Sequence, residues 1–181
     1  MRAFTCLLVP AALGLTGSVL AGQGRPVVEL GTHAGVTILS GGGSSLTQFR
    51  IPGKGILGQP TIYGTILAGS GLLVEPQIAL NILSSEGETA TTVGLAGQVG
   101  YAFSGHTMNS PFIFGTGAFQ SVSGGGVSDS EFGAGAGVGY RLIIGQHFSI
   151  RFDGHFRRWF DSELNEFAAG VGFGGVLWSS R

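Results

Sequence analysis

The feature that most constrains this chain is an alternation of period two between apolar side chains and small or polar ones. In residues 27–39, mostly apolar residues at the even positions alternate with Glu29, Gly31, His33 and Thr37 at odd positions. A side-chain period of two is that of a β-strand with one apolar face. The segment therefore predicts a strand that separates an apolar from a polar environment.

The same alternation recurs along the chain between Gly- and Ser-rich turns such as SGGG, AGSG and SSEGET, which indicates successive antiparallel hairpins. The strand signal is weaker in two segments. Residues 59–67 form a short segment, and residues 111–122 carry apolar side chains on both faces, so the sequence does not decide which face of 111–122 points inward. After residue 22, no apolar run is long enough for a transmembrane helix. The predicted strands are 27–39, 59–67, 72–83, 91–103, 111–122, 131–142, 147–159 and 165–177.

Strand signals over more than half of the chain would be unusual in a soluble domain but are expected of a closed barrel. Lipid offers no hydrogen bonds to the backbone, so a sheet can span a membrane only by closing on itself. We therefore expect an all-β fold, an eight-stranded antiparallel up-and-down transmembrane β-barrel of the bacterial outer-membrane type. With both termini periplasmic, the external connections are expected at about 40–58, 84–90, 122–130 and 159–164.

The N-terminus predicts secretion. Residues 1–21 combine a positive start, an apolar stretch and the small-residue site Val19-Leu20-Ala21, which is typical of a cleaved signal peptide; a spanning N-terminal helix is the alternative. The barrel domain then covers residues 22–181. Cys6 is the only cysteine and lies in the leader, so we expect no disulfide, thiolate nucleophile or cysteine metal site in the mature chain. The mature net charge, 8 − 10 = −2, gives no reason to expect nucleic-acid binding.

The stretch SIRFDGHFRR, residues 149–158, raises three possibilities: a catalytic constellation, a nucleic-acid patch or a buried structural network. In a barrel, its charged residues share the inward face. Counting from the turns places Arg157 opposite Glu166 on one side, and opposite Gly133 on the other, one diagonal step from Glu131. Arg151 then lies opposite Gly139, and large side chains meet glycines, as a narrow interior requires.

A one-residue slip would turn Arg151 and Arg157 towards lipid at a cost of about 2–4 kcal/mol each, so the charges also fix the register. We expect the interior charges to compensate one another. The predicted interior polar network consists of Glu29, His33, Glu75, Glu131, Arg141, Arg151, Asp153, His155, Arg157 and Glu166.

Other motifs favour structural roles. The glycines of GAGAGVGYR recur every two residues, which does not match the spacing or context of a dinucleotide-binding loop. The four histidines show no metal-ligand spacing, so we expect no metal and no cofactor. Aromatic residues near the strand ends are expected to form girdles at the membrane interfaces, namely Tyr101, Phe103, Tyr140, Trp159, Phe160 and Trp178.

The leader, the strands and sequences such as TTVGLAGQVGYAF and EFGAGAGVGYRL resemble the outer-membrane β-barrel superfamily of OmpA/OmpX-like, "porin family" proteins, over nearly all of residues 25–178. One departure is the C-terminal sequence LWSSR, where members usually end on an aromatic residue. The resemblance implies an outer-membrane location, lipid as the surroundings and insertion by the barrel-assembly machinery. The external partner stays open, with the 40–58 loop as the best candidate for outside contacts.

For function, this predicts a structural or surface-interaction protein with a side-chain-filled polar lumen and at most a narrow pore. The first alternative is a lipid-modifying barrel enzyme, because some barrels that resemble this one act on lipid A. Its candidate residues would be Ser149, Asp153 and His155, or His33 with a carboxylate. The second alternative is a soluble secreted barrel that carries an apolar ligand. We expect no enzymatic activity.

Overall fold

The computed structural model describes residues 26–50, 61–85, 88–104, 109–124, 127–145 and 147–178, together with Gly53, Ile56 and Gln59. The predicted signal peptide lies outside the described residues. The described strands are β1 (Val27–Gly41), β2 (Ser44–Arg50), β3 (Thr61–Leu67), β4 (Leu72–Ser85), β5 (Glu88–Ala102), β6 (Ser110–Gly124), β7 (Val127–Ile144), β8 (Phe148–Trp159) and β9 (Asn165–Trp178).

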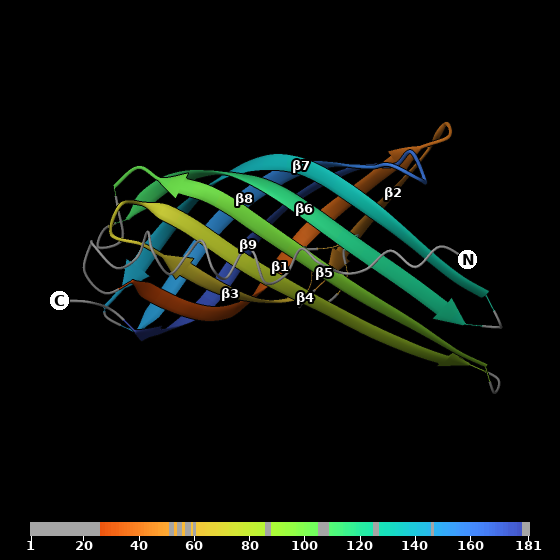
Figure 1. The fold of residues 1–181 in the computed structure, drawn as a ribbon, viewed down its shortest axis with the longest axis horizontal. Coiled ribbons are helices and arrows are strands. Elements are labelled where there is room, and N and C mark those ends of the chain that lie inside the picture. The colour runs from red at the N-terminus through yellow and green to blue at the C-terminus, as the bar shows by residue number, and fades with distance from the viewer. Residues whose placement is uncertain are drawn as a thin grey trace, which may run out of the picture.

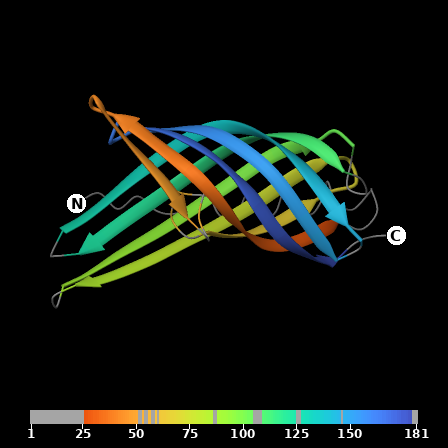
Figure 2. The same ribbon diagram turned by 180° about the vertical axis from the view of Figure 1, so that it is seen from behind.

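The strands form one antiparallel sheet that closes on itself (Figures 1 and 2). Each strand pairs with the next along the chain from β3 onwards, and β9 returns to pair with β1 over most of its length. β2 and β3 share the second position of the wall: β3 pairs with Val27–Thr32 of β1, and β2 with Gly35–Gly41. The predicted eight-stranded antiparallel up-and-down barrel is confirmed.

The two ends of the barrel differ. We call the end at which β1 begins and β9 finishes the terminal end, and the opposite end, at which β1–β2, β4–β5, β6–β7 and β8–β9 connect, the hairpin end (Figure 1). The β1–β2 connection is the pair Gly42-Gly43, with φ of 58° and 82°. Positive φ at both central residues is what a two-residue hairpin turn of type I′ requires, and glycine adopts it without steric cost.

The alternation decides which side chains line the lumen. On β1, Glu29, His33 and Thr37 are each 1% exposed, whereas Leu30 and Ile38 are 52% and 40% exposed on the outer surface. The same division holds on the other predicted strands. On β6, where the sequence left the inward face open, Phe112, Phe114, Thr116, Ala118 and Gln120 are buried. The barrel is therefore apolar outside and polar in the middle of its interior, as its predicted setting in lipid requires.

The 40–58 region differs from the expectation of a long external loop. Residues 44–50 extend the hairpin with β1 as strand β2. Beyond β2, Gly53 forms an isolated bridge with Ala34, and its N–H donates to the His33 carbonyl at 2.7 Å. Ile56 is fully buried. The prediction of a solvated loop is therefore wrong for residues 44–50, which form a strand, and for Ile56, which is buried. The external position of this connection stays a prediction.

Candidate functional site

The centre of the lumen is organised around Arg151 of β8. Its guanidinium forms a bidentate ion pair with Glu75 of β4, with Nη2 to Oε1 at 2.7 Å and Nη1 to Oε2. Nη2 also contacts Nε2 of His33 at 2.7 Å, and Nε lies 3.0 Å from Oδ2 of Asp153. The guanidinium carbon sits 4.2 Å from the ring centre of Tyr63. Arg151 of β8 thus contacts side chains of β1, β3 and β4.

The carboxylate of Glu75 is held from several sides. It accepts hydrogen bonds from Thr65 Oγ1 at 2.5 Å and from Gln77 Nε2 at 2.7 Å, besides those from Arg151. Buried ions require this kind of compensation, because their desolvation is expensive. Nearby, the Tyr63 hydroxyl donates to Oε1 of Glu29 at 2.9 Å, and Nη1 of Arg141 lies 3.8 Å from Oε2 of the same carboxylate.

A second polar group surrounds Glu166 of β9, nearer the hairpin end. Its carboxylate accepts from Trp159 Nε1 at 2.7 Å and from Arg157 Nη1 at 3.3 Å, and His155 Nε2 lies 3.0 Å away. Arg157 also donates to Thr116 Oγ1 at 2.9 Å. The pairing of Arg157 with Glu166 across the β8–β9 ladder agrees with the position counted from the turns.

Glycines on the neighbouring strands make room for these side chains. A Cβ built on Gly172 would lie 2.8 Å from Cγ of Arg151 and 3.1 Å from Cδ2 of His33. A Cβ on Gly133 would lie 2.9 Å from the Trp159 indole and 3.0 Å from Cδ of Arg157, and one on Gly174 would overlap Glu29. The glycine repeats of β7 and β9 therefore serve packing and not phosphate binding.

Buried apolar side chains form clusters on both sides of the polar centre. At the terminal end, a first layer is formed by Val27, Leu67, Leu73, Ala102, Phe112, Phe114 and Val176. Nearer the hairpin end, a second layer is formed by Ile56, Ala79, Ala118 and Trp159, with Leu39, Ala96 and Leu164 packed against it. We refer to them as the terminal layer and the hairpin layer.

The structure places the predicted site residues as follows. Nine are buried in the lumen, whereas Glu131 is only half-buried, beside Gln120 at a small depression between β6 and β7. Two neighbours of these residues, Tyr63 and Trp159, were not predicted as interior partners. The nine buried residues are Glu29, His33, Glu75, Arg141, Arg151, Asp153, His155, Arg157 and Glu166.

Two sequence-based details are wrong. Arg157 lies opposite Gly135 and not Gly133, and Arg151 lies opposite Arg141, because β7 continues to Ile144 and shifts the β7–β8 register by two residues. A shift of two keeps every side chain on its face. Trp159 was expected in an interfacial girdle, but it is fully buried, since it shares its face of β8 with Arg157.

The other predicted girdle residues whose side chains are described face outward. Tyr101, Phe103, Tyr140 and Phe160 are between 43% and 57% exposed. Tyr101 and Phe103 pack edge to face, with their ring centres 5.6 Å apart, at the terminal end of β5. Their positions agree with those of an interfacial girdle.

Ser149, the candidate nucleophile of a hydrolase site, is engaged by the backbone. The hydroxyl of Ser149 donates to the carbonyl of Gly174 at 3.5 Å and is fully buried. Nucleophilic catalysis needs a hydroxyl that is in reach of a base and accessible to substrate. Among the described residues, no cluster of His, Cys, Asp and Glu suits a metal ion, and no helix is long and apolar enough to cross a membrane.

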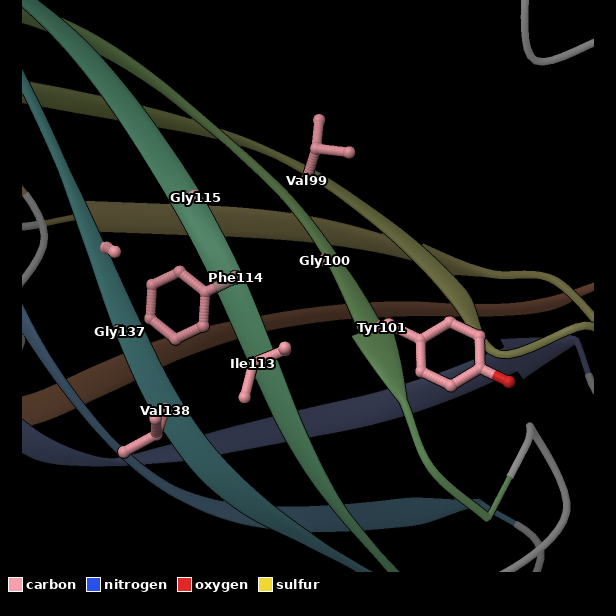
Figure 3. Close-up of a pocket in the computed structure, with 9 residues that line it drawn as sticks. Val99, Gly100, Tyr101, Ile113, Phe114, Gly115, Gly137 and Val138 are labelled. Carbon is pink, nitrogen blue, oxygen red and sulfur yellow. The ribbon is translucent and has the colours of Figure 1, made fainter.

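The outer surface carries a shallow apolar depression over β5, β6 and β7 (Figure 3). Val99, Ile113 and Val138 surround Gly115, whose missing side chain creates the hollow. Tyr101 supplies the only polar side chain among its lining residues. The depression lies on the same outer face as the exposed apolar residues of these strands.

Comparison with solved structures identifies the architecture. Neisserial surface protein A (NspA) matches with a TM-score of 0.60 and 11% identity, over 83% of this chain and 97% of that one. Ail, the attachment invasion locus protein of Yersinia pestis, in complex with the heparin analogue sucrose octasulfate, matches with a TM-score of 0.52 and 12% identity, over 84% and 98%. No protein-family model matches the chain, and no curated protein does. The expected resemblance to OmpA/OmpX-like outer-membrane barrels is confirmed at the level of the fold.

Proposed function

We propose that this chain is an integral outer-membrane protein with a structural or surface-interaction role and a lumen that does not conduct solutes. The observation that carries the proposal is the distribution of polarity. Apolar side chains such as Ile78, Leu80 and Ile82, which are 55–60% exposed, cover the outside, whereas Arg151 and Arg157 are at most 1% exposed inside. This is the reverse of what a soluble carrier of apolar ligands needs.

The closed lumen supports a role other than transport. Eight strands enclose an interior that side chains fill, and here the polar centre lies between the terminal layer and the hairpin layer. A general porin needs a wider, water-filled barrel. The buried Ser149 likewise gives no support to lipid modification in the lumen. What remains available for function is the outer surface and the hairpin end.

The Ail structure contains a heparin analogue. The charges at the hairpin end of this chain do not favour binding of such a polysulfate. Asp129, Asp161 and Glu163 are exposed there, and Arg158 is already engaged by the side chain of Asn165 at 3.0 Å and by the Glu163 carbonyl. The exposed carboxylates would repel a polyanion.

Cell fractionation combined with planar-bilayer recording tests the proposal. We expect the protein in the outer-membrane fraction, with a heat-dependent shift in gel mobility as the folded barrel unfolds, and no conductance steps from the purified protein. Recovery in the soluble periplasmic fraction would contradict the membrane assignment. Regular conductance steps would contradict the closed lumen.

A further inference from the structure

The β6–β7 hairpin brings the side chains of Gln120, Asp129 and Glu131 together at the hairpin end of the barrel (Figure 1). Gln120 of β6 lies directly opposite Glu131 of β7, and Val122 lies opposite Asp129. Directly opposite residues of an antiparallel pair have Cβ atoms about 4.5–5.5 Å apart, and residues two positions apart share a face of the sheet. The three side chains are therefore within reach of one another.

These three residues, with Val122 and Ser130, line a depression of about 260 Å³. A water molecule takes about 30 Å³, so the depression has room for one metal ion and several waters. The atoms that the three side chains can offer to a cation are oxygens: the amide oxygen of Gln120 and the carboxylates of Asp129 and Glu131. Oxygen ligands of this kind suit Ca²⁺ and Mg²⁺ and not the softer transition metals.

Gln120 distinguishes this place from an ordinary pair of surface carboxylates. It is only 7% exposed, and its Oε1 is buried and accepts no hydrogen bond from the described part of the chain. Oε2 of Glu131, directly across the ladder, is likewise buried and has no donor among the described residues. A buried oxygen without a donor is unfavourable, so the two oxygens favour an occupant that carries positive charge.

The charges of the two carboxylates point to the same kind of occupant. Asp129 and Glu131 lie two positions apart on one face of β7, so their charges repel each other. Oδ1 of Asp129 accepts from the Ser130 N–H at 2.8 Å, but among the described residues no ion pair joins either carboxylate to an arginine or lysine. Arg158 is instead paired with Glu163. One divalent cation balances both charges.

The burial of the oxygens decides between a metal ion and an amine. An ammonium group is about the size of water and stays about 2.7–2.9 Å from an oxygen. The buried oxygens of Gln120 and Glu131 are covered against a group of that size. Ca²⁺ is smaller and approaches oxygens to about 2.3–2.6 Å. Ca²⁺ also accepts irregular sets of carboxylate, amide and water oxygens, whereas Mg²⁺ demands near-ideal octahedral geometry.

We propose that Gln120, Asp129 and Glu131 form a Ca²⁺ site on the β6–β7 hairpin, in which water completes the coordination shell. The ligands are two carboxylates and one amide, so the site is not among the groups of three or more His, Cys, Asp and Glu side chains, of which the described residues form none that suits a metal. Two charged ligands correspond to a weak site, with a Kd of about 10⁻⁴–10⁻³ M, as in extracellular modules. Bound Ca²⁺ joins β6 to β7 near their last pair, Gly124 and Val127.

The test uses the full mature chain, refolded in zwitterionic detergent micelles, so that both ends of the barrel are accessible and no anionic lipid binds the metal. Calorimetric titration with CaCl₂ at constant ionic strength measures the Kd, and a heat-dependent gel shift verifies that each variant is folded. Glu131→Gln removes a charged ligand, and Gln120→Met removes the amide oxygen at similar volume and unchanged charge. Glu163→Gln is the matched control, because it removes a carboxylate at the same end but outside the depression.

We expect Glu131→Gln to raise the Kd about tenfold and Gln120→Met to raise it about threefold, because each removes a ligand, whereas Glu163→Gln should leave it unchanged. Gln120→Met is decisive, since a general attraction of Ca²⁺ to the acidic surface does not depend on a neutral amide. In the parent protein, Ca²⁺ should also slow the hydrogen exchange of the β6 and β7 amides near Gly124. The absence of saturable binding up to about 10 mM Ca²⁺, or equal Kd values for the parent and Gln120→Met, would overturn the site.

Discussion

At the scale of the residue, the stability of the interior depends on the pairing of buried charges. Substitution of Arg151 tests this dependence. Removing it by Arg151→Met leaves Glu75 and Asp153 buried without their common cation. Breaking a buried ion pair in this way costs about 3–5 kcal/mol. We expect a corresponding loss in the free energy of unfolding, measured by urea titration of the protein in vesicles. The double variant Arg151→Met/Glu75→Gln should recover part of the loss.

Arg158→Met is the matched control for this prediction. Arg158 lies on the same strand, but its side chain is 39% exposed and its ion-pair partner Glu163 is 81% exposed, with Nη2 and Oε2 3.9 Å apart. Exposed pairs contribute about 0–1 kcal/mol. A loss with Arg158→Met as large as that with Arg151→Met would show that charge alone, and not its burial, sets the cost.

Glycine positions provide a second residue-scale prediction. Gly172→Ala would place a methyl group within 3.1 Å of both Arg151 and His33, so we expect destabilisation of about 1–3 kcal/mol from overpacking. Gly117→Ala faces the outer surface with nothing within 4 Å and should be neutral or stabilising by about 0.5–1 kcal/mol. Urea unfolding of both variants in vesicles measures the difference, and equal effects would argue against a packed lumen.

Alternation predicted residue orientation well, because inside and outside differ so strongly in polarity. His33 and Arg157 are buried as their positions in the alternation indicate. The alternation also places Trp159 inside, since it follows Arg157 by two residues. An interfacial position was expected instead because of its bulk and its place at a strand end. Tyr63 was missed because its strand is short, and the contact with Glu29 joins residues 34 positions apart.

At the scale of the element, the turns decide where strands meet. Gly42 and Gly43 have positive φ, and neither has any atom within 4 Å of an added Cβ. The cost of a substitution is therefore conformational, about 1–2 kcal/mol for an ordinary L-residue. We expect Gly42→Val to weaken protection of the β1–β2 amides in hydrogen exchange. Gly42→Asn should have little effect, because asparagine tolerates this region, and an equal loss with both would contradict a type I′ turn.

The ends of the strands were harder to predict from the sequence than their faces. Short turns with clear ends gave the β8–β9 register correctly, with Arg157 opposite Glu166. The β7–β8 register was wrong by two residues because Ile143 and Ile144 extend β7 and periodicity fixes only the face of a strand. Residues 44–50, SSLTQFR, were not recognised as a strand, since most of their side chains are exposed and their burial does not alternate clearly.

At the scale of the whole molecule, the proposed closure of the lumen by two apolar layers is redundant, because either layer alone would seal it. We expect Ile56→Gly alone to remain silent in planar bilayers, because Phe112 and Phe114 of the terminal layer still close the other end. Ile56→Gly combined with Phe112→Gly and Phe114→Gly should produce measurable conductance. Conductance from Ile56→Gly alone would show that the terminal layer does not seal the barrel.

The overall architecture was predictable because a membrane-spanning sheet has few alternatives to closure. What the sequence did not reveal is the division of the second wall position between β2, which ends at Arg50, and β3, which begins at Thr61, and the burial of Ile56. Ile56 packs with Ala79 and Trp159, which are distant in the chain and leave no periodic trace.

The matching of bulky lumen side chains to glycines on the adjacent strands has a consequence for how such proteins diverge. The space available in each layer limits the combined volume of two facing side chains and not the volume of either one. A large residue and its facing glycine can therefore exchange places during evolution. Many unrelated sequences then satisfy the same barrel. This chain and NspA share the fold at a TM-score of 0.60 although only 11% of the residues are identical.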